Sequence, residues 1–193
     1  MSQLDELLPA LQVRVPGAPT AVLKLEVQRV ARDFFRRTEV YEKEYVIASE
    51  TDETEYDVQA EVLAGEHVDV VRVMSVWPED WSAGLALSAY SVSEAGVVTL
   101  VTAIDTGVDI IFKAVLVPRK TWTALDQTLF TRHSDAIEAG ALSELYSLPY
   151  GWKDPAEALR QQAEYERLCG KAKGDRLKGR QNRQLFAALK QWD

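Results

Sequence analysis

The chain has 193 residues, of which 47% are apolar and five are tryptophan, so it can bury a core without disulfides or structural metals. No apolar run reaches the roughly 20 residues that cross a bilayer, which excludes a membrane-spanning helix. The first residues lack the basic and then apolar order of a signal peptide, so we expect the chain to fold in a cytoplasm.

The net charge of −8 is unevenly distributed. From Lys171 onward the chain has seven of the 22 basic and two of the 30 acidic residues, so this segment carries +5. The preceding part, with 15 basic and 28 acidic residues, carries −13. An acidic body with a basic tail predicts that the tail binds a negative surface. That surface could belong to a partner protein, to a neighbouring copy of the chain or to nucleic acid.

Two helices are predicted in the first 38 residues. Leu4, Leu7, Leu8 and Leu11 share one helical face, and residues 15–19, with two prolines and a glycine, then turn the chain. Pro19 suits the first position of a second helix. Apolar residues at three- and four-residue steps predict that this helix is amphipathic. Its predicted packing face consists of Leu23, Val27, Val30, Ala31, Phe34, Phe35 and Thr38.

Short strands are predicted between residues 40 and 118. β-Branched and aromatic residues are concentrated in six segments, with turn residues such as Gly65, Gly96 and Gly107 between them. We expect strands at residues 40–48, 56–58, 68–77, 86–92, 97–101 and 109–117. Short strands with such turns indicate an antiparallel sheet or a small barrel.

Two further helices are predicted after Pro118, which ends the sheet. Apolar residues at helical spacing between Leu129 and Leu148 predict the first. The second has Asp154 as its cap, Pro155 in its first turn and Glu157 placed to reach back in a capping box. We expect its packing side to consist of Leu159, Gln162, Ala163, Glu166 and Cys169.

The predicted fold class is α+β. A helical bundle from the N- and C-terminal helices spans residues 1–39 and 119–170, a β insertion spans residues 40–118, and an extended basic tail spans residues 171–193. Gly170, Gly174 and Gly179 each cost about 1 kcal/mol in a helix. Helix in this last stretch is therefore less favoured, and residues 183–192 are expected either to form a final short helix on a partner or to stay mobile.

The sequence contains no recognisable motif for catalysis. Phosphate-binding glycine loops and the GxSxG elbow are absent, and His67, His133 and Cys169 cannot assemble a zinc site. We interpret His133 as a core or interface histidine rather than a base, and Cys169 as a packing residue rather than a nucleophile. The acidic residues 49–57 lack EF-hand spacing, which favours a solvated loop over a weak cation site. We expect no enzymatic activity and no cofactor; a hydrolase that uses carboxylates has no positive support.

Two pairs of residues are candidates for interfaces. Trp77 and Trp81 lie around a turn, where they either fill the core or serve as a binding hot spot for a partner protein or a neighbouring subunit. Gly140 and Ala141 share a helix face, where small side chains let another helix approach closely. That helix could belong to the same chain or to another subunit.

Two stretches resemble the head-to-tail adaptor (connector, head-completion or neck) proteins of tailed bacteriophages. The first is VPGAP at residues 15–19, leading into a helix that ends with ARDFFRRT at residues 31–38. The second is IEAGALSEL at residues 137–145, followed by LPYGWKDP at residues 148–155, with Ala158 and Tyr165 in the next helix. The resemblance covers most of residues 7 to 170.

This resemblance implies a structural protein of the virion neck. Copies would form a ring, a dodecamer in the family, which binds the portal, extends the channel for packaged double-stranded DNA and attaches the tail or nozzle protein. The segment that we expect to bind the portal contains Lys171, Lys173, Arg176, Lys178, Arg180, Arg183, Phe186, Leu189 and Trp192. The alternative is a nucleic-acid-binding protein that uses the same tail, whose affinity would fall steeply with salt.

Overall fold

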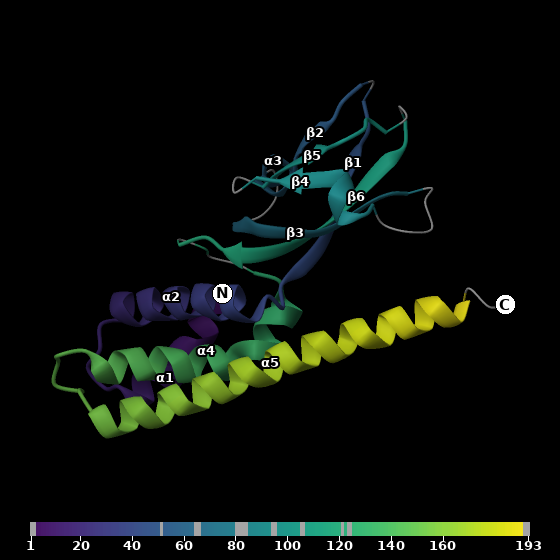
Figure 1. Ribbon diagram of the computed structural model, residues 1–193. Coiled ribbons are helices and arrows are strands. Elements are labelled where there is room, and N and C mark those ends of the chain that lie inside the picture. Colours follow the sequence, from purple (N-terminus) through teal and green to yellow (C-terminus); the bar gives the residue numbers. More distant parts are fainter. Residues whose placement is uncertain are drawn as a thin grey trace. The chain divides into compact units, whose positions relative to one another are not determined.

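The structure is a computed structural model that describes residues 3–190 except 51, 64–66, 80–84, 94–95, 105–106, 121 and 123–124. It describes only the backbone of Gln3, Leu63, Leu87 and residues 180–190. The chain forms two compact units, which we call the helical unit (Met1–Val40 with Ala124–Asp193) and the sheet unit (Tyr41–Thr123). The fold is α+β, with helices from both ends of the sequence in one unit and antiparallel sheets in the other (Figure 1).

The helical unit begins with α1 (Gln3–Arg14) and α2 (Thr20–Thr38). All seven residues of the predicted packing face of α2 are buried, which confirms the amphipathic pattern. The polar Thr38 can be buried at little cost because its hydroxyl donates to the Phe34 carbonyl at 2.7 Å. Pro19 lies one position earlier than expected, because it is the N-cap of α2 and its carbonyl accepts from Val22 and Leu23.

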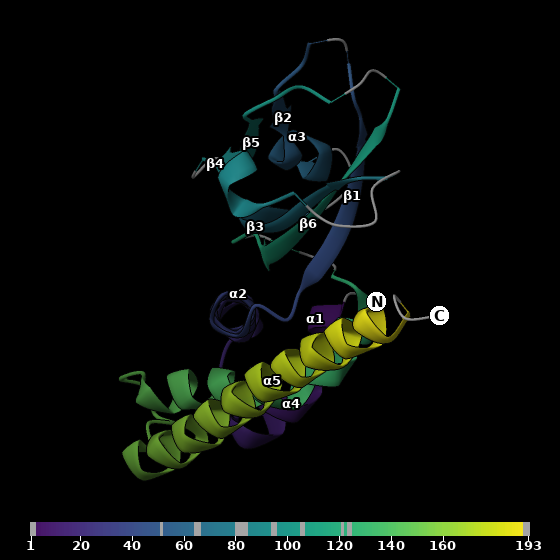
Figure 2. The same cartoon turned by 45° about the vertical axis from the view of Figure 1, so that its right-hand side comes forward.

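The central element of the helical unit is α4 (Gln127–Ser147), which packs against α1, α2 and α5 (Pro155–Lys190). Figures 1 and 2 show α4 and α5 side by side. The backbone of α5 stays helical past Gly170, Gly174 and Gly179, so the basic segment continues this helix as far as Lys190. Adding residues to a formed helix is cooperative and tolerates about 1 kcal/mol for each glycine. Within the described part of the chain, every helix is too short or too polar to span a membrane.

In the described residues of the sheet unit, the strands form two three-stranded antiparallel sheets. The first has the order β1-β6-β3, where β1 is Glu42–Ala48, β6 is Asp109–Pro118 and β3 is Val68–Pro78. The second has the order β2-β5-β4, where β2 is Glu55–Asp57, β5 is Val97–Leu100 and β4 is Tyr90–Val92. The central strand β6 is buried at all of its last five residues, which explains its long run of apolar side chains.

The two sheets contact through buried aromatic rings. Tyr56 on β2 lies with its ring centroid 5.6 Å from that of Phe112 on β6. Two local expectations are wrong. In the first, Val58 does not extend β2 but begins a short helix, α3 (Val58–Leu63). The cause is Asp57, whose side chain accepts from the Ala60 N–H at 2.8 Å and so caps the helix. Residues 87–89 similarly form a 3-10 turn (η1, Leu87–Ala89) rather than strand.

Candidate functional site

The helix that carries the basic residues, α5, has a well-formed beginning. Oδ1 of Asp154 accepts from the N–H groups of Ala156 at 3.1 Å and Glu157 at 3.0 Å, which confirms the expected cap. The second bond of a capping box is not formed. The Asp154 N–H donates to the Tyr146 carbonyl at 3.1 Å, and the Glu157 carboxylate accepts from two side chains of its own helix.

The side of α5 that packs on the unit differs in part from the predicted one. Leu159 is 73% exposed, and Ala163 and Glu166 are also exposed, so these three positions of the predicted face are wrong. Cys169 is buried as predicted, and Gln162 is half-buried. The reason is that the Tyr165 ring lies over Gly140 of α4, and residues at helical steps from Tyr165 therefore face inward. The buried positions of α5 are Ala158, Gln161, Tyr165, Cys169 and Ala172.

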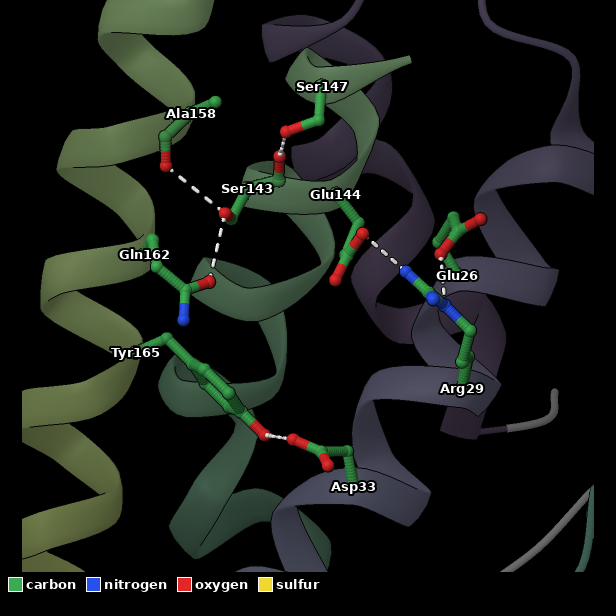
Figure 3. A network of polar contacts seen from close by, with 9 residues as sticks. All are labelled: Glu26, Arg29, Asp33, Ser143, Glu144, Ser147, Ala158, Gln162 and Tyr165. Atoms are coloured by element: carbon green, nitrogen blue, oxygen red, sulfur yellow. Dashed lines mark hydrogen bonds and ion pairs between the residues drawn. The ribbon is translucent and has the colours of Figure 1, made fainter.

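Polar side chains connect α4 to the helices on either side of it (Figure 3). The Ser143 hydroxyl lies 3.1 Å from a carbonyl oxygen of α5 and 3.2 Å from Oε1 of Gln162. On the other side of α4, Arg29 of α2 binds both Glu26 on its own helix and Glu144 on α4. Because Glu26 is buried, this shared arginine supplies the partner that its carboxylate needs.

A second group of contacts connects α5 to α2. The Tyr165 hydroxyl donates to Oδ2 of Asp33 at 2.8 Å, and burial raises the pKa of this phenol (Figure 3). Arg37 donates to the Glu166 carboxylate, and its guanidinium lies 5.5 Å from the centroid of the Tyr165 ring. Burial also raises the pKa of the Cys169 thiol, which keeps it protonated. Cys169 therefore lies in this interface as a packing residue.

Among the described side chains of α5, the last one packed against the unit is Arg176. Its Nη1 lies 2.7 Å from Oε2 of Glu39, and the two side chains are only 12% and 25% exposed. Glu39 is the C-cap of α2, so the ion pair joins α5 to the end of that helix. Leu177, the next residue, is 55% exposed. Figures 1 and 2 show that α5 then continues beyond α2 and α4.

The basic residues proposed to bind the portal are thus divided into two groups. Lys171, Lys173 and Lys178 are exposed and accessible to a partner, whereas Arg176 is held in an ion pair within the chain. The remaining residues of the set have no described side chains: Arg180, Arg183, Phe186 and Leu189 lie where only the helical backbone is described, and Trp192 lies outside the described residues. Arg176 lies four residues after the buried Ala172 and therefore on the same side of α5. Its inward position could have been predicted from this spacing once the buried side was known.

Gly140 and Ala141 lie inside the helical unit. A Cβ atom at Gly140 would collide with Val30 of α2 and would lie 3.0 and 3.1 Å from ring carbons of Tyr165. Ala141 is fully buried. The close helix approach that Gly140 permits is therefore made within the chain, to α2 and α5.

The two tryptophans of the predicted aromatic turn have different positions. Trp77 lies on β3 opposite Ile111 of β6 and is partly exposed. Trp81 lies outside the described residues. Trp77 is thus partly accessible on the sheet unit.

His133 packs against aromatic residues of α2. Its ring centroid lies 5.0 Å from that of Phe34 and 6.4 Å from that of Phe35. Burial and the nearby Arg132 lower the pKa of His133 to about 4, and Asp175 opposes this shift. The imidazole is therefore neutral at pH 7, as a core histidine would be.

The described residues offer no group of three or more His, Cys, Asp or Glu side chains that could hold a metal ion. This includes the described part of the acidic residues 49–57, in which residue 51 is not described. The candidate site consists of the exposed lysines of α5, Lys171, Lys173 and Lys178. Among known proteins, no family model and no curated protein sequence matches the chain.

Proposed function

We propose that the chain is a ring-forming head-to-tail adaptor in the neck of a tailed bacteriophage. It binds the portal through the basic end of α5, extends the DNA channel and provides the surface for tail attachment. The observation that supports this best is that α5 continues past Arg176, its last packed residue, with Lys171, Lys173 and Lys178 exposed. The resemblance of residues 15–38 and 137–165 to phage adaptors supports it independently.

The charges along α5 favour a negatively charged partner for its second half. In the first half, the acidic and basic side chains compensate one another in three ion pairs: Glu157–Arg160, Glu164–Arg167 and Glu166–Arg37. After Gly170, Asp175 is the single acid before Asp193. Complementary charge of this kind accelerates association and selects the partner more than it adds affinity.

A ring also requires that one face of each copy bind a different face of the next, because only a heterologous interface closes a ring of this kind. The exposed large apolar side chains of the helical unit include Leu25 on α2 at 59% and Leu159 on α5 at 73%. Single exposed apolar residues are ordinary in a monomer. In the proposed ring these two helices supply the two faces.

The portal interaction can be tested with a variant that ends at Gly179. This variant keeps every described packing contact of α5, so its fold should be intact. We expect the full chain to co-sediment with portal rings of the same phage. The shortened chain should bind at least about tenfold more weakly, because it lacks the basic residues 180 and 183 and the apolar anchors Phe186, Leu189 and Trp192. Equal binding by both chains, or absence of the protein from isolated virion necks by mass spectrometry, would overturn the proposal.

The alternative, a nucleic-acid-binding protein, uses the same exposed lysines. The salt dependence of the affinity for DNA distinguishes it from the adaptor. Replacement of Lys171, Lys173 and Lys178 by Gln should weaken portal binding, and the full chain should show no tight binding to free duplex DNA at physiological salt. If the full chain instead bound free DNA tightly at physiological salt, with the steep salt dependence of phosphate contacts, the nucleic-acid function would replace the adaptor function.

A further inference from the structure

Glu39 has an unfavourable backbone conformation at the end of α2. Its φ of 53° and ψ of 29° place it in the left-handed region, where glycine is the usual residue after a helix. Its N–H donates to the Phe35 carbonyl at 2.9 Å, which closes the last turn. A glutamate is less stable than glycine in this conformation because its Cβ crowds the backbone. A favourable contact of the Glu39 carboxylate would offset this cost.

That contact is the ion pair with Arg176. The separation of 2.7 Å between Nη1 and Oε2, together with the low exposure of both side chains, makes this pair better shielded than the other ion pairs of α5. The Arg167–Glu164 pair, for comparison, has side chains that are 61% and 45% exposed. In addition, Arg176 places a positive charge at the carbonyl end of α2, where the helix dipole favours a cation.

We propose that the Glu39–Arg176 ion pair is the positioning contact that fixes the point at which α5 leaves the helical unit, so that residues 177–190 are presented to a partner as a helix of defined direction. This inference rests on the proposed function for the identity of the partner. Arg176 is then not a portal-binding residue but an anchor within the chain. A helix held in its binding direction loses less conformational freedom on association, and this increases its affinity.

Hydrogen exchange tests the anchor without any partner. In the variants Glu39→Gln and Arg176→Gln, we expect the amides of residues 172–179 to exchange roughly tenfold faster, because a partly buried pair is worth about that factor, while amides of residues 158–165 keep their rates. The variant Arg167→Gln, which removes an exposed pair from the same helix, is the matched control and should change neither region. Combining Glu39→Arg with Arg176→Glu should restore slow exchange. Unchanged exchange in both single variants, or no recovery in the reversed pair, would overturn the proposal.

Binding to portal rings tests the consequence. The single variants should bind roughly tenfold more weakly than the natural chain, and the reversed pair should recover most of this loss, because the contact acts through position rather than through the charge of Arg176. Unaltered portal affinity in variants with accelerated exchange would refute the positioning role. If the natural chain does not bind portal rings at all, the proposed function fails, whereas the exchange measurements still decide whether the ion pair anchors α5.

Discussion

The replacement Gly140→Ala should destabilise the helical unit, although alanine is normally the better residue in a helix. The gain in helix propensity from this change is about 1 kcal/mol. Against it stands the new Cβ, which would collide with Val30 and would lie 3.0 Å from the Tyr165 ring. Overpacking a core by one carbon costs about 1–3 kcal/mol, and the collision with Val30 places this site at the upper end. We therefore expect a net loss of about 1–2 kcal/mol in the free energy of unfolding.

The assay is equilibrium unfolding in urea, followed by circular dichroism at 222 nm, which reports mainly on the helices. Gly170→Ala is the matched control, because it lies on α5 with nothing within 4 Å of its added Cβ. It should stabilise the protein by up to about 1 kcal/mol. Adding Val30→Ala to Gly140→Ala removes the colliding methyl group, so the double variant should be more stable than the sum of the two single losses predicts. If Gly140→Ala were as stable as the natural chain, the proposed packing of α4 between α2 and α5 would be wrong.

Three further predictions concern the same unit. Because the folded pKa of His133, about 4, lies below its ordinary value of 6.5, the unfolded chain binds more protons between these values, and stability should fall as the pH is lowered from 6.5 to 4. The contribution of His133 to this loss in the free energy of unfolding should reach about 2 kcal/mol after allowance for solvent screening. The variant His133→Asn should flatten this part of the curve of stability against pH, measured by unfolding in urea. Asp154→Ala should cost about 1 kcal/mol of unfolding free energy in the same assay, and Asp154→Asn much less, because asparagine also caps a helix. Tyr165→Phe should lower the free energy of unfolding by about 1 kcal/mol, because it removes the hydrogen bond to Asp33. If this loss were the same in a chain that also carries Asp33→Ala, the double-mutant cycle would contradict that hydrogen bond.

Local sequence patterns determined the type and order of most elements. The face from Leu23 to Thr38 repeats at helical steps and is buried in full, and the strands around Phe112 follow from their β-branched residues. Such patterns are informative because burial on one side of a helix or strand imposes a period on the sequence that forms it. Asp57, by contrast, could have predicted α3, because aspartate is a common helix N-cap. The β-branched Val58 that follows it favoured a strand instead.

The packing side of α5 was decided only by the tertiary structure. Leu159 is the most apolar residue of its turn, yet it faces solvent because the Tyr165 ring fits over Gly140, and this fixes the rotation of the whole helix. The same rotation places Arg176 beside Glu39, so that two residues far apart in the sequence form an ion pair. The periodicity of one helix indicates that one of its sides is buried. It does not determine the shape of the neighbouring surface against which that side packs. That shape depends on α2 and α4 together, so the site at which α5 leaves the unit appears only when all three helices are packed.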